Sequence, residues 1–296
     1  MKEKTGFISI LGPTNAGKST LMNAIMGRKV SIVSHKVQTT RTNLRAVKMV
    51  GGTQIIFTDT PGMFRPARRL DRAMVRAASA SINDSDAILL MIDAKHGITK
   101  TIVELIEKVK DKTNVFAVVN KVDSVKKDLL LPIIAGLSEY NIFHEIFLIS
   151  ALKNDGVEKM LDSLAAVMPE APHLFPAADA PDIPDALWLA EITREKVYKY
   201  LHQELPYDIF VATEKVDTDD EGVLEIYQKI VVKSDNHKKI AIGRGGELLG
   251  RIGTAARHEI QDEWGVNARL HLFVRVEPDW QERRENYEDQ GLEFGK

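Results

Sequence analysis

The 296-residue sequence contains no cysteine, which excludes disulfide bonds, thiolate zinc sites and cysteine nucleophiles. It also lacks an apolar stretch of about 18 residues, the length that a transmembrane helix needs, and its first apolar run, Phe7–Leu11, is too short for a signal-peptide core. A strong net charge is absent too, because 40 Lys and Arg residues face 42 Asp and Glu residues. The sequence therefore predicts a cytoplasmic protein in which any nucleic-acid contact comes from local basic clusters.

Short apolar runs alternate with helix-like stretches up to about residue 168, a pattern typical of a mostly parallel α/β sheet flanked by helices. Gly51 and Gly52 predict a hairpin between the second and third strands, which would be the antiparallel pair. Six strands are expected in this part: Phe7–Leu11, Leu44–Met49, Gln54–Asp59, Ala87–Asp93, Val115–Asn120 and Ile146–Ser150.

The rest of the chain has a different organisation. Residues 169–186 are rich in proline, which disfavours helix and sheet, so they are predicted to form a linker. Residues 187–280 predict the order helix, strand, strand, helix, helix, strand, which indicates a smaller α+β domain with antiparallel strands. Because the linker begins at residue 169, the first domain is expected to span residues 1–168. Residues 281–296 are polar and acidic and are expected to be a frayed tail.

A phosphate-binding loop is predicted directly after the first strand, where Gly12–Ser19 reads GPTNAGKS and an apolar helix follows. Glycine at positions 12 and 17 would let backbone N–H groups approach phosphate at a helix N-terminus. Lys18 would bring its charge to the terminal phosphates, and Ser19 would offer a hydroxyl to Mg²⁺. The alternative for this segment alone is a glycine-rich turn with a chance Lys-Ser pair.

Two further motifs favour a nucleotide site. Asp59–Gly62 reads DTPG, in which Asp59 could hold Mg²⁺ through water and Gly62 could donate its N–H to the terminal phosphate. In Asn120–Asp123, NKVD, an ionised Asp123 only accepts hydrogen bonds, which suits the N1–H and 2-amino donors of guanine. The predicted GTP/GDP site comprises Gly12, Pro13, Thr14, Asn15, Ala16, Gly17, Lys18, Ser19, Thr20, Asp59, Thr60, Pro61, Gly62, Asn120, Lys121, Asp123, Ser150, Ala151 and Leu152.

In this order the motifs resemble the translation-factor branch of P-loop GTPases over residues 4–168. The resemblance extends to QTTR at Gln38–Arg41 and implies that Thr40 is the second protein ligand of Mg²⁺ beside Ser19, with Thr39 as the close competitor. Met63 stands where many GTPases carry a water-orienting glutamine, so slow intrinsic hydrolysis is expected.

The catalytic residues expected from this resemblance are Lys18, Thr40, Gly62 and Asn15. Two roles remain open for Asn15. Its side-chain carbonyl could help to hold K⁺ beside the phosphates, as in potassium-stimulated relatives, or it could stabilise the loop by local hydrogen bonds.

In the second domain, Gly243–Gly246 reads GRGG and resembles the GXXG loop of a KH domain, and the surrounding elements follow the KH type II order. Such a loop lets an RNA backbone approach the peptide, and the following helix N-terminus favours phosphate, so single-stranded RNA is the expected target. A helix-ending glycine turn is the alternative for the loop alone. The predicted RNA-binding residues are Lys233, Lys238, Lys239, Ile242, Gly243, Arg244, Gly245, Gly246 and Arg251.

The two domains together resemble the bacterial Era family of GTPases over nearly the whole chain. This resemblance implies a monomeric switch in maturation of the small (30S) ribosomal subunit, binding near the 3′ end of 16S rRNA, with loose association with the inner membrane. A GTPase of tRNA modification or of large-subunit assembly should carry extra domains. A plain RNA-binding protein with a vestigial nucleotide site should carry degraded motifs, whereas those of this chain are intact.

Overall fold

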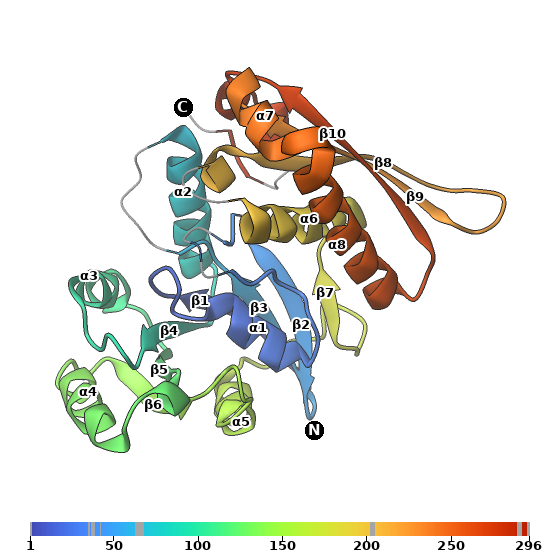
Figure 1. Ribbon diagram of the computed structural model, residues 1–296. Helices are drawn as coiled ribbons and strands as arrows, with labels where there is room; N and C mark the ends of the chain where they lie inside the picture. Colours follow the sequence, from blue (N-terminus) through green and yellow to red (C-terminus); the bar gives the residue numbers. More distant parts are fainter. Residues whose placement is uncertain are drawn as a thin grey trace. The chain divides into compact units, whose positions relative to one another are not determined.

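The computed structural model describes residues 2–34, 36, 39–41, 43–62, 68–201, 205–288 and 292–294. The chain divides into two compact units, residues 1–182 and residues 183–296. Each unit has its own sheet and its own hydrophobic core, and Figure 1 labels their elements.

The first unit is built on a mostly parallel sheet with the strand order β6-β5-β4-β1-β3-β2-β7. Its strands are β1 (Lys4–Leu11), β2 (Leu44–Val50), β3 (Thr53–Asp59), β4 (Ala87–Asp93), β5 (Val115–Asn120), β6 (Phe143–Ile149) and β7 (Ala180–Asp182). Strands β2 and β3 are antiparallel, as the two glycines between them predicted. Strands β3 and β5 are buried over their whole length because helices cover both faces of the sheet.

Two layers of helices cover this sheet. Helices α1 (Lys18–Met26) and α5 (Val157–Val167) pack on one face, and α2 (Arg69–Asn83), α3 (Lys100–Val109) and α4 (Leu130–Ser138) pack on the other. Strand β4 shows why both faces are apolar: Leu89 and Met91 point into the first core, whereas Ile88 and Leu90 point into the second. Short 3₁₀ turns occur at Val122–Ser124 and Lys127–Leu129.

The sheet has seven strands where the sequence predicted six. The additional strand, β7, lies inside the segment predicted to be a linker and pairs antiparallel with β2 at the edge of the sheet (Figure 1). Asp179 secures it by accepting hydrogen bonds from Lys48 Nζ at 2.6 Å and from the Met49 N–H at 2.8 Å. An edge strand tolerates Pro181, because proline lacks only an N–H donor. The first unit therefore extends to residue 182.

The second unit has the predicted order of elements. They are α6 (Asp185–Tyr200), β8 (Phe210–Thr218), β9 (Leu224–Val232), α7 (Asp235–Ile242), α8 (Glu247–Trp264) and β10 (Ala268–Val276), with 3₁₀ turns at Leu205–Asp208, Arg244–Gly246 and Trp280–Glu282 and a last helix, α9 (Glu285–Glu288). The sheet order is β10-β9-β8. It is mixed and not wholly antiparallel as expected, since β9 and β10 run parallel.

The prediction of a frayed tail is wrong for the described residues beyond position 280. Within the predicted tail, Tyr287 is fully buried and Leu292 is nearly so, and Trp280, directly before it, is fully buried as well. The Trp280 ring stacks on Phe210 with centroids 5.6 Å apart, and its Nε1 donates to the Asp208 carbonyl at 3.1 Å. The segment therefore belongs to the second unit. Within the described residues, no helix is long and apolar enough to cross a membrane.

Candidate nucleotide and RNA sites

A cavity of about 590 Å³ lies in the first unit, where the carboxyl ends of parallel strands meet. It brings together residues from every predicted nucleotide motif, although these motifs are far apart in the sequence. The cavity is lined by Thr14, Asn15, Gly17, Lys18, Ser19, Thr20, Ile32, Val33, Ser34, Thr39, Thr40, Gly62, Lys121, Asp123, Ser124 and Leu152. The other predicted residues do not line it; they are Gly12, Pro13, Ala16, Asp59, Thr60, Pro61, Asn120, Ser150 and Ala151.

The glycines of this site are required by close packing. A Cβ atom at Gly17 would lie 2.3 Å from Nδ2 of Asn120, and one at Gly62 would lie 2.9 Å from Cγ2 of Thr14. Gly17 also has a φ of +98°, which side chains other than glycine rarely adopt. The sequence predicted these glycines for access to phosphate. The structure adds that Gly17 of the phosphate loop packs closely against Asn120 at the end of β5, and that Gly62 after β3 packs closely against Thr14 of the phosphate loop.

Lys18 is held inside the phosphate loop. Its Nζ donates to the carbonyl oxygens of Gly12 at 3.2 Å and Pro13 at 3.0 Å, and the residue is 6% exposed. Burial lowers the pKa of Lys18 to about 8, although the nearby charge of Asp59 acts in the opposite direction. The side chain is therefore placed where a polyanionic ligand would stabilise its charged form.

The three predicted magnesium ligands lie together behind this lysine. One oxygen of Asp59, Oδ2, accepts from three hydroxyls: Ser19 Oγ at 2.8 Å, Ser31 Oγ at 2.8 Å and Thr40 Oγ1 at 3.2 Å. The other oxygen, Oδ1, is buried without a hydrogen-bond partner. Burial raises the pKa of Asp59, against the effects of Lys18 and the three hydroxyls. A buried carboxylate with an unsatisfied oxygen, next to two hydroxyls at the cavity, fits a hard cation such as Mg²⁺.

Thr40 and its close competitor as a predicted magnesium ligand, Thr39, lie in different surroundings. Thr40 is 5% exposed, and its hydroxyl lies 2.9 Å from Ser19 Oγ, whereas Thr39 Oγ1 donates to the Lys36 carbonyl at 2.8 Å. The structure thus brings Thr40, and not Thr39, to Asp59.

Ser31 is a residue that the sequence analysis missed. It is fully buried, and Asn23 of α1 fixes its backbone. Asn23 Oδ1 accepts from the N–H groups of Val30 at 2.8 Å and Ser31 at 2.9 Å, while its Nδ2 donates to the Ser31 carbonyl at 2.8 Å. Asn23 thereby directs the Ser31 hydroxyl at Asp59. No sequence motif marks Asn23 or Ser31, so these hydrogen bonds become apparent only in the folded structure.

The base-reading motif is fixed to the phosphate loop by Asn120. This side chain is 2% exposed; its Nδ2 donates to the Ala16 carbonyl at 2.9 Å, and its Oδ1 accepts from the Ala151 N–H at 3.0 Å. Asn120 thus joins the loop after β1 to the segment after β6, where the small residues Ser150 and Ala151 were expected.

Lys121 and Asp123 complete this end of the cavity. Lys121 Nζ donates to the Asn15 carbonyl at 2.6 Å and to Asp93 Oδ2 at 2.7 Å. Asp93 is a second residue that the sequence missed. Burial alone would raise the pKa of Asp93, but the hydrogen bonds from Lys121 and from the Lys95 N–H, together with nearby positive charge, lower it. The Asp123 side chain lines the cavity with Lys153 Nζ 3.9 Å away. Met63 and Gln38 lie outside the described residues, so slow hydrolysis remains a prediction.

A groove of about 400 Å³ lies in the second unit, between α8 and the edge strand β10. Gly245 and Gly246 of the predicted GXXG loop have positive φ angles of +59° and +84°, and a Cβ on either would meet no atom within 4 Å. The backbone there is open to a ligand. Gly243 differs, because a Cβ on it would lie 2.7 Å from Cβ of Leu248. The groove is lined by Gly246, Leu249, Gly250, Gly253, Thr254, Arg257, Arg269, Leu270, His271 and Leu272.

Most predicted RNA-binding side chains do not line this groove. Lys233 pairs with Asp208 at 2.9 Å, and the Arg251 guanidinium lies over the Tyr200 ring, 4.9 Å from its centroid. Ile242 is only partly buried against the core of the unit. Lys238, Lys239, Gly243, Arg244 and Gly245 are also absent from the lining.

The basic side chains that do line the groove are Arg257, Arg269 and His271, which the sequence analysis did not assign to RNA binding. The small residues Gly246, Gly250 and Gly253 spaced along α8 are the signal that could have indicated an open helix face.

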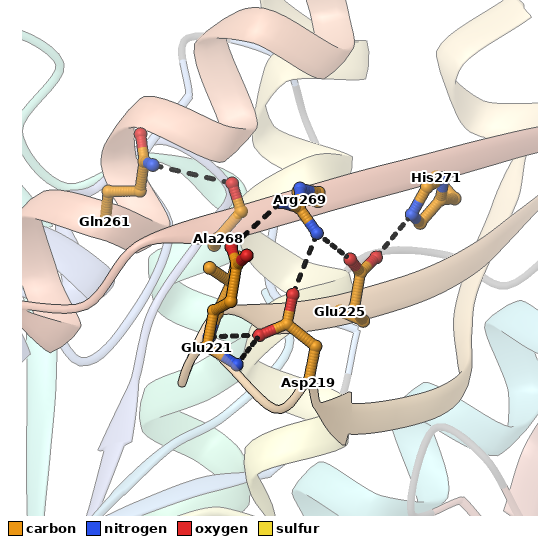
Figure 2. A network of polar contacts seen from close by, with 8 residues as sticks. Asp219, Glu221, Glu225, Gln261, Ala268, Arg269 and His271 are labelled. Carbon is orange, nitrogen blue, oxygen red and sulfur yellow. Dashed lines mark hydrogen bonds and ion pairs between the residues drawn. The ribbon is translucent and has the colours of Figure 1, made fainter.

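Carboxylates of the β8–β9 hairpin fix two of these side chains (Figure 2). Arg269 Nη1 donates to Asp219 Oδ2 at 2.9 Å and to Glu225 Oε1 at 2.7 Å. Nε2 of His271 lies 2.6 Å from Glu225 Oε2. The hydrogen bonds from Arg269 and His271 lower the pKa of Glu225. These contacts therefore fix the positions of the Arg269 and His271 side chains on the β10 side of the groove.

Comparison with known proteins identifies the family. Residues 7–121 match the family described as 50S ribosome-binding GTPase, and residues 204–281 match the KH domain family. The chain is 45% identical over 294 residues to GTPase Era of Rhizobium meliloti (strain 1021), covering 99% of this chain and 94% of that protein. The chain belongs to the GTPase Era family. GTPase Era of Agrobacterium fabrum is 44% identical over 98% of this chain and 92% of its own.

Two solved Era structures share the fold. An Aquifex aeolicus Era variant bound to GDP.AlF4- superposes with a TM-score of 0.92 at 36% identity, covering 97% of this chain and 99% of its own. Era in complex with MgGDPNP and nucleotides 1506–1542 of 16S ribosomal RNA has a TM-score of 0.93 at 36% identity, covering 98% and 99%. The predictions of a P-loop GTPase domain followed by a KH domain, and of a GTP-hydrolysing enzyme, are confirmed.

Proposed function

We propose that this Era-family GTPase is a GTP-driven switch in assembly of the small ribosomal subunit, and that its KH groove binds single-stranded 16S rRNA near the 3′ end. The supporting observation is that one chain combines the cavity lined by Lys18 and Asp123 with a groove that adjoins the GXXG loop, where the backbone at Gly245 and Gly246 is open. A relative with a TM-score of 0.93 holds MgGDPNP and nucleotides 1506–1542 of 16S rRNA together.

In the nucleotide site, Lys18 would exchange its loop carbonyl partners for oxygens of the β- and γ-phosphates. Ser19 and Thr40 would hold Mg²⁺ directly, and Asp59 would hold it through water. The bound ion would neutralise charge that develops on the phosphates. Asp123 lines the cavity as an acceptor for the guanine N1–H and 2-amino groups.

The two roles of Asn15 lead to a proposal about potassium. Asn15 lines the cavity with φ at +63°, and its carbonyl is held by Lys121. Because this residue belongs to the phosphate loop and lines the cavity, we propose that its side-chain carbonyl helps to hold K⁺ beside the phosphates. The resemblance to the family further supports the proposal of a cytoplasmic monomer with loose association with the inner membrane.

The test of RNA binding uses two glycines with matched geometry. Gly245 and Gly265 both have φ near +60° and open space for a Cβ, but only Gly245 belongs to the GXXG loop. Gly245→Asp should weaken binding of a 16S rRNA 3′-end oligonucleotide at least tenfold, because a carboxylate would face phosphate, whereas Gly265→Asp should bind like the parent. Fluorescence anisotropy measures both affinities. GTP hydrolysis without RNA should be unchanged in both variants, and equal RNA affinity of the two would contradict the proposal.

A further inference from the structure

The sheet of the second unit has one face turned away from its helices. Successive residues of β10 alternate between faces: Leu272 and Val274 pack in the core with residues of α6, α7 and α8, so Phe273 lies on the opposite side. The register places Phe273 opposite Lys229 and His271 opposite Tyr227 of β9. We call the surface formed by Tyr227, Lys229, His271 and Phe273 the open face.

The open face carries a row of aromatic rings. Phe273 is 49% exposed, and it is the only aromatic residue among the exposed large hydrophobic side chains of the described part of the chain. One register step away, the rings of Tyr227 and His271 stack with centroids 4.6 Å apart and planes 14° from parallel. An exposed phenylalanine beside a stacked ring pair provides flat apolar surface of the kind on which unstacked bases pack.

This row is continuous with the groove. His271 and Arg269 line the groove and also stand on the same side of β10 as Phe273, because they are two and four residues before it. Since β10 is the edge strand of the sheet, a chain that leaves the groove across β10 passes from His271 directly to Phe273.

The charges of the open face favour stacking over attraction to phosphate. Arg275 makes two hydrogen bonds to Glu214, at 2.8 and 3.0 Å, and Lys229 lies 4.0 Å from the same carboxylate. Arg269 is paired with Glu225 in the same way (Figure 2). Because these cations are compensated, the open face offers little net field to an acidic protein segment. It offers ring surface next to the groove, which suits the bases of a single strand that the groove already holds.

We propose that RNA leaving the KH groove crosses β10 and stacks a base on Phe273, beside the Tyr227–His271 pair. This inference rests on the proposed RNA binding of the groove and extends its footprint to the open face.

The experiment compares two RNAs on the full-length protein by fluorescence anisotropy. A fragment of about four nucleotides fills only the groove, whereas one of about twelve nucleotides also reaches the open face. Phe273→Ala should weaken binding of the longer RNA roughly tenfold and leave the shorter one unchanged. Phe273→Trp should retain parental affinity, and Phe273→Leu, which keeps an apolar side chain without a ring, should behave like the alanine variant. Because no phosphate contact is lost, the dependence of affinity on salt should have the parental slope.

Gly245→Asp separates this inference from the function of the groove, since it should weaken both RNAs. If Gly245→Asp changes neither affinity while Phe273→Ala weakens the longer RNA, the open face binds RNA and the groove assignment fails. If Phe273→Ala and Phe273→Leu bind the longer RNA like the parent, the open-face inference is overturned. This holds even if the two variants bind ribosomal subunits more weakly, because that result would indicate that the open face contacts a protein. An equal loss for both RNAs would overturn it too, because Phe273 would then act within the groove.

Discussion

Asn120 offers the sharpest test of how the nucleotide site is held together. Replacing it with alanine removes its hydrogen bonds to the Ala16 carbonyl and the Ala151 N–H, both within 3.0 Å, and leaves these two backbone groups buried. Two neutral hydrogen bonds contribute about 1 kcal/mol each, and an unsatisfied buried group costs about 1–3 kcal/mol. We therefore expect Asn120→Ala to lower the free energy of unfolding of the nucleotide-free protein by about 2–4 kcal/mol.

The assay can use the distribution of tryptophan. All three tryptophans, Trp188, Trp264 and Trp280, belong to the second unit, so their fluorescence reports its unfolding in urea while circular dichroism reports both units. The transition that appears only in circular dichroism should shift in Asn120→Ala. Asn83→Ala is the matched control, since Asn83 is exposed and its Oδ1 accepts a hydrogen bond from Lys112 Nζ at 3.0 Å. Its effect should stay within about 0.5 kcal/mol.

The reasoning on Asn120 is refuted if Asn120→Ala and Asn83→Ala unfold at the same urea concentration with the same slope. The Asn120→Asp variant provides a second test of these hydrogen bonds. Its carboxylate can still accept from the Ala151 N–H, but it would face the Ala16 carbonyl, so this variant should be destabilised as well.

Other predictions concern single interactions. Ser31→Ala should lower the affinity for Mg²⁺ severalfold, because Asp59 loses a donor that fixes its orientation. The affinity can be measured from the rate at which a fluorescent GDP is released at increasing Mg²⁺ concentrations, and the same Mg²⁺ dependence as in the parent would contradict the prediction. Asp123→Asn should weaken GTP binding by several kcal/mol, and equal competition by ATP and GTP in the parent would refute guanine selectivity. If Asn15 holds K⁺, hydrolysis should be faster in potassium than in sodium at equal ionic strength. Trp280→Ala should destabilise the second unit by about 3–5 kcal/mol in urea denaturation, and an unchanged transition would mean that the terminal segment is dispensable.

The parts of the fold that the sequence could predict are those with a local signature. The phosphate loop and the strands before and after it were predictable because glycine positions and apolar runs lie close together in the chain. Strand β7 was not, since its residues Ala180–Asp182 include a proline and have no apolar pattern. It is held by Asp179, which bonds to Lys48 and Met49 more than 100 residues away. Such long-range pairing has no local signal.

The same distinction applies to the two sites. Asp59 and Asp123 were predictable because motifs mark them, whereas Asn23 and Ser31 act through geometry that appears only when α1 packs on the sheet. In the KH domain, the loop glycines were predictable. The groove cation Arg269 was not, because it lies on a strand whose alternating apolar residues indicated only a core position.

The arrangement around Asp59 explains how one carboxylate can orient a magnesium site. Ser19 and Thr40 direct their hydroxyl protons at Asp59 Oδ2, which leaves their oxygen lone pairs available to a cation in the cavity that both residues line. Ser31 donates to the same oxygen but does not line the cavity, so it can act only on the orientation of the carboxylate. Ser19→Ala should therefore remove a proposed metal ligand, whereas Ser31→Ala should keep the proposed ligands and lose only part of their alignment.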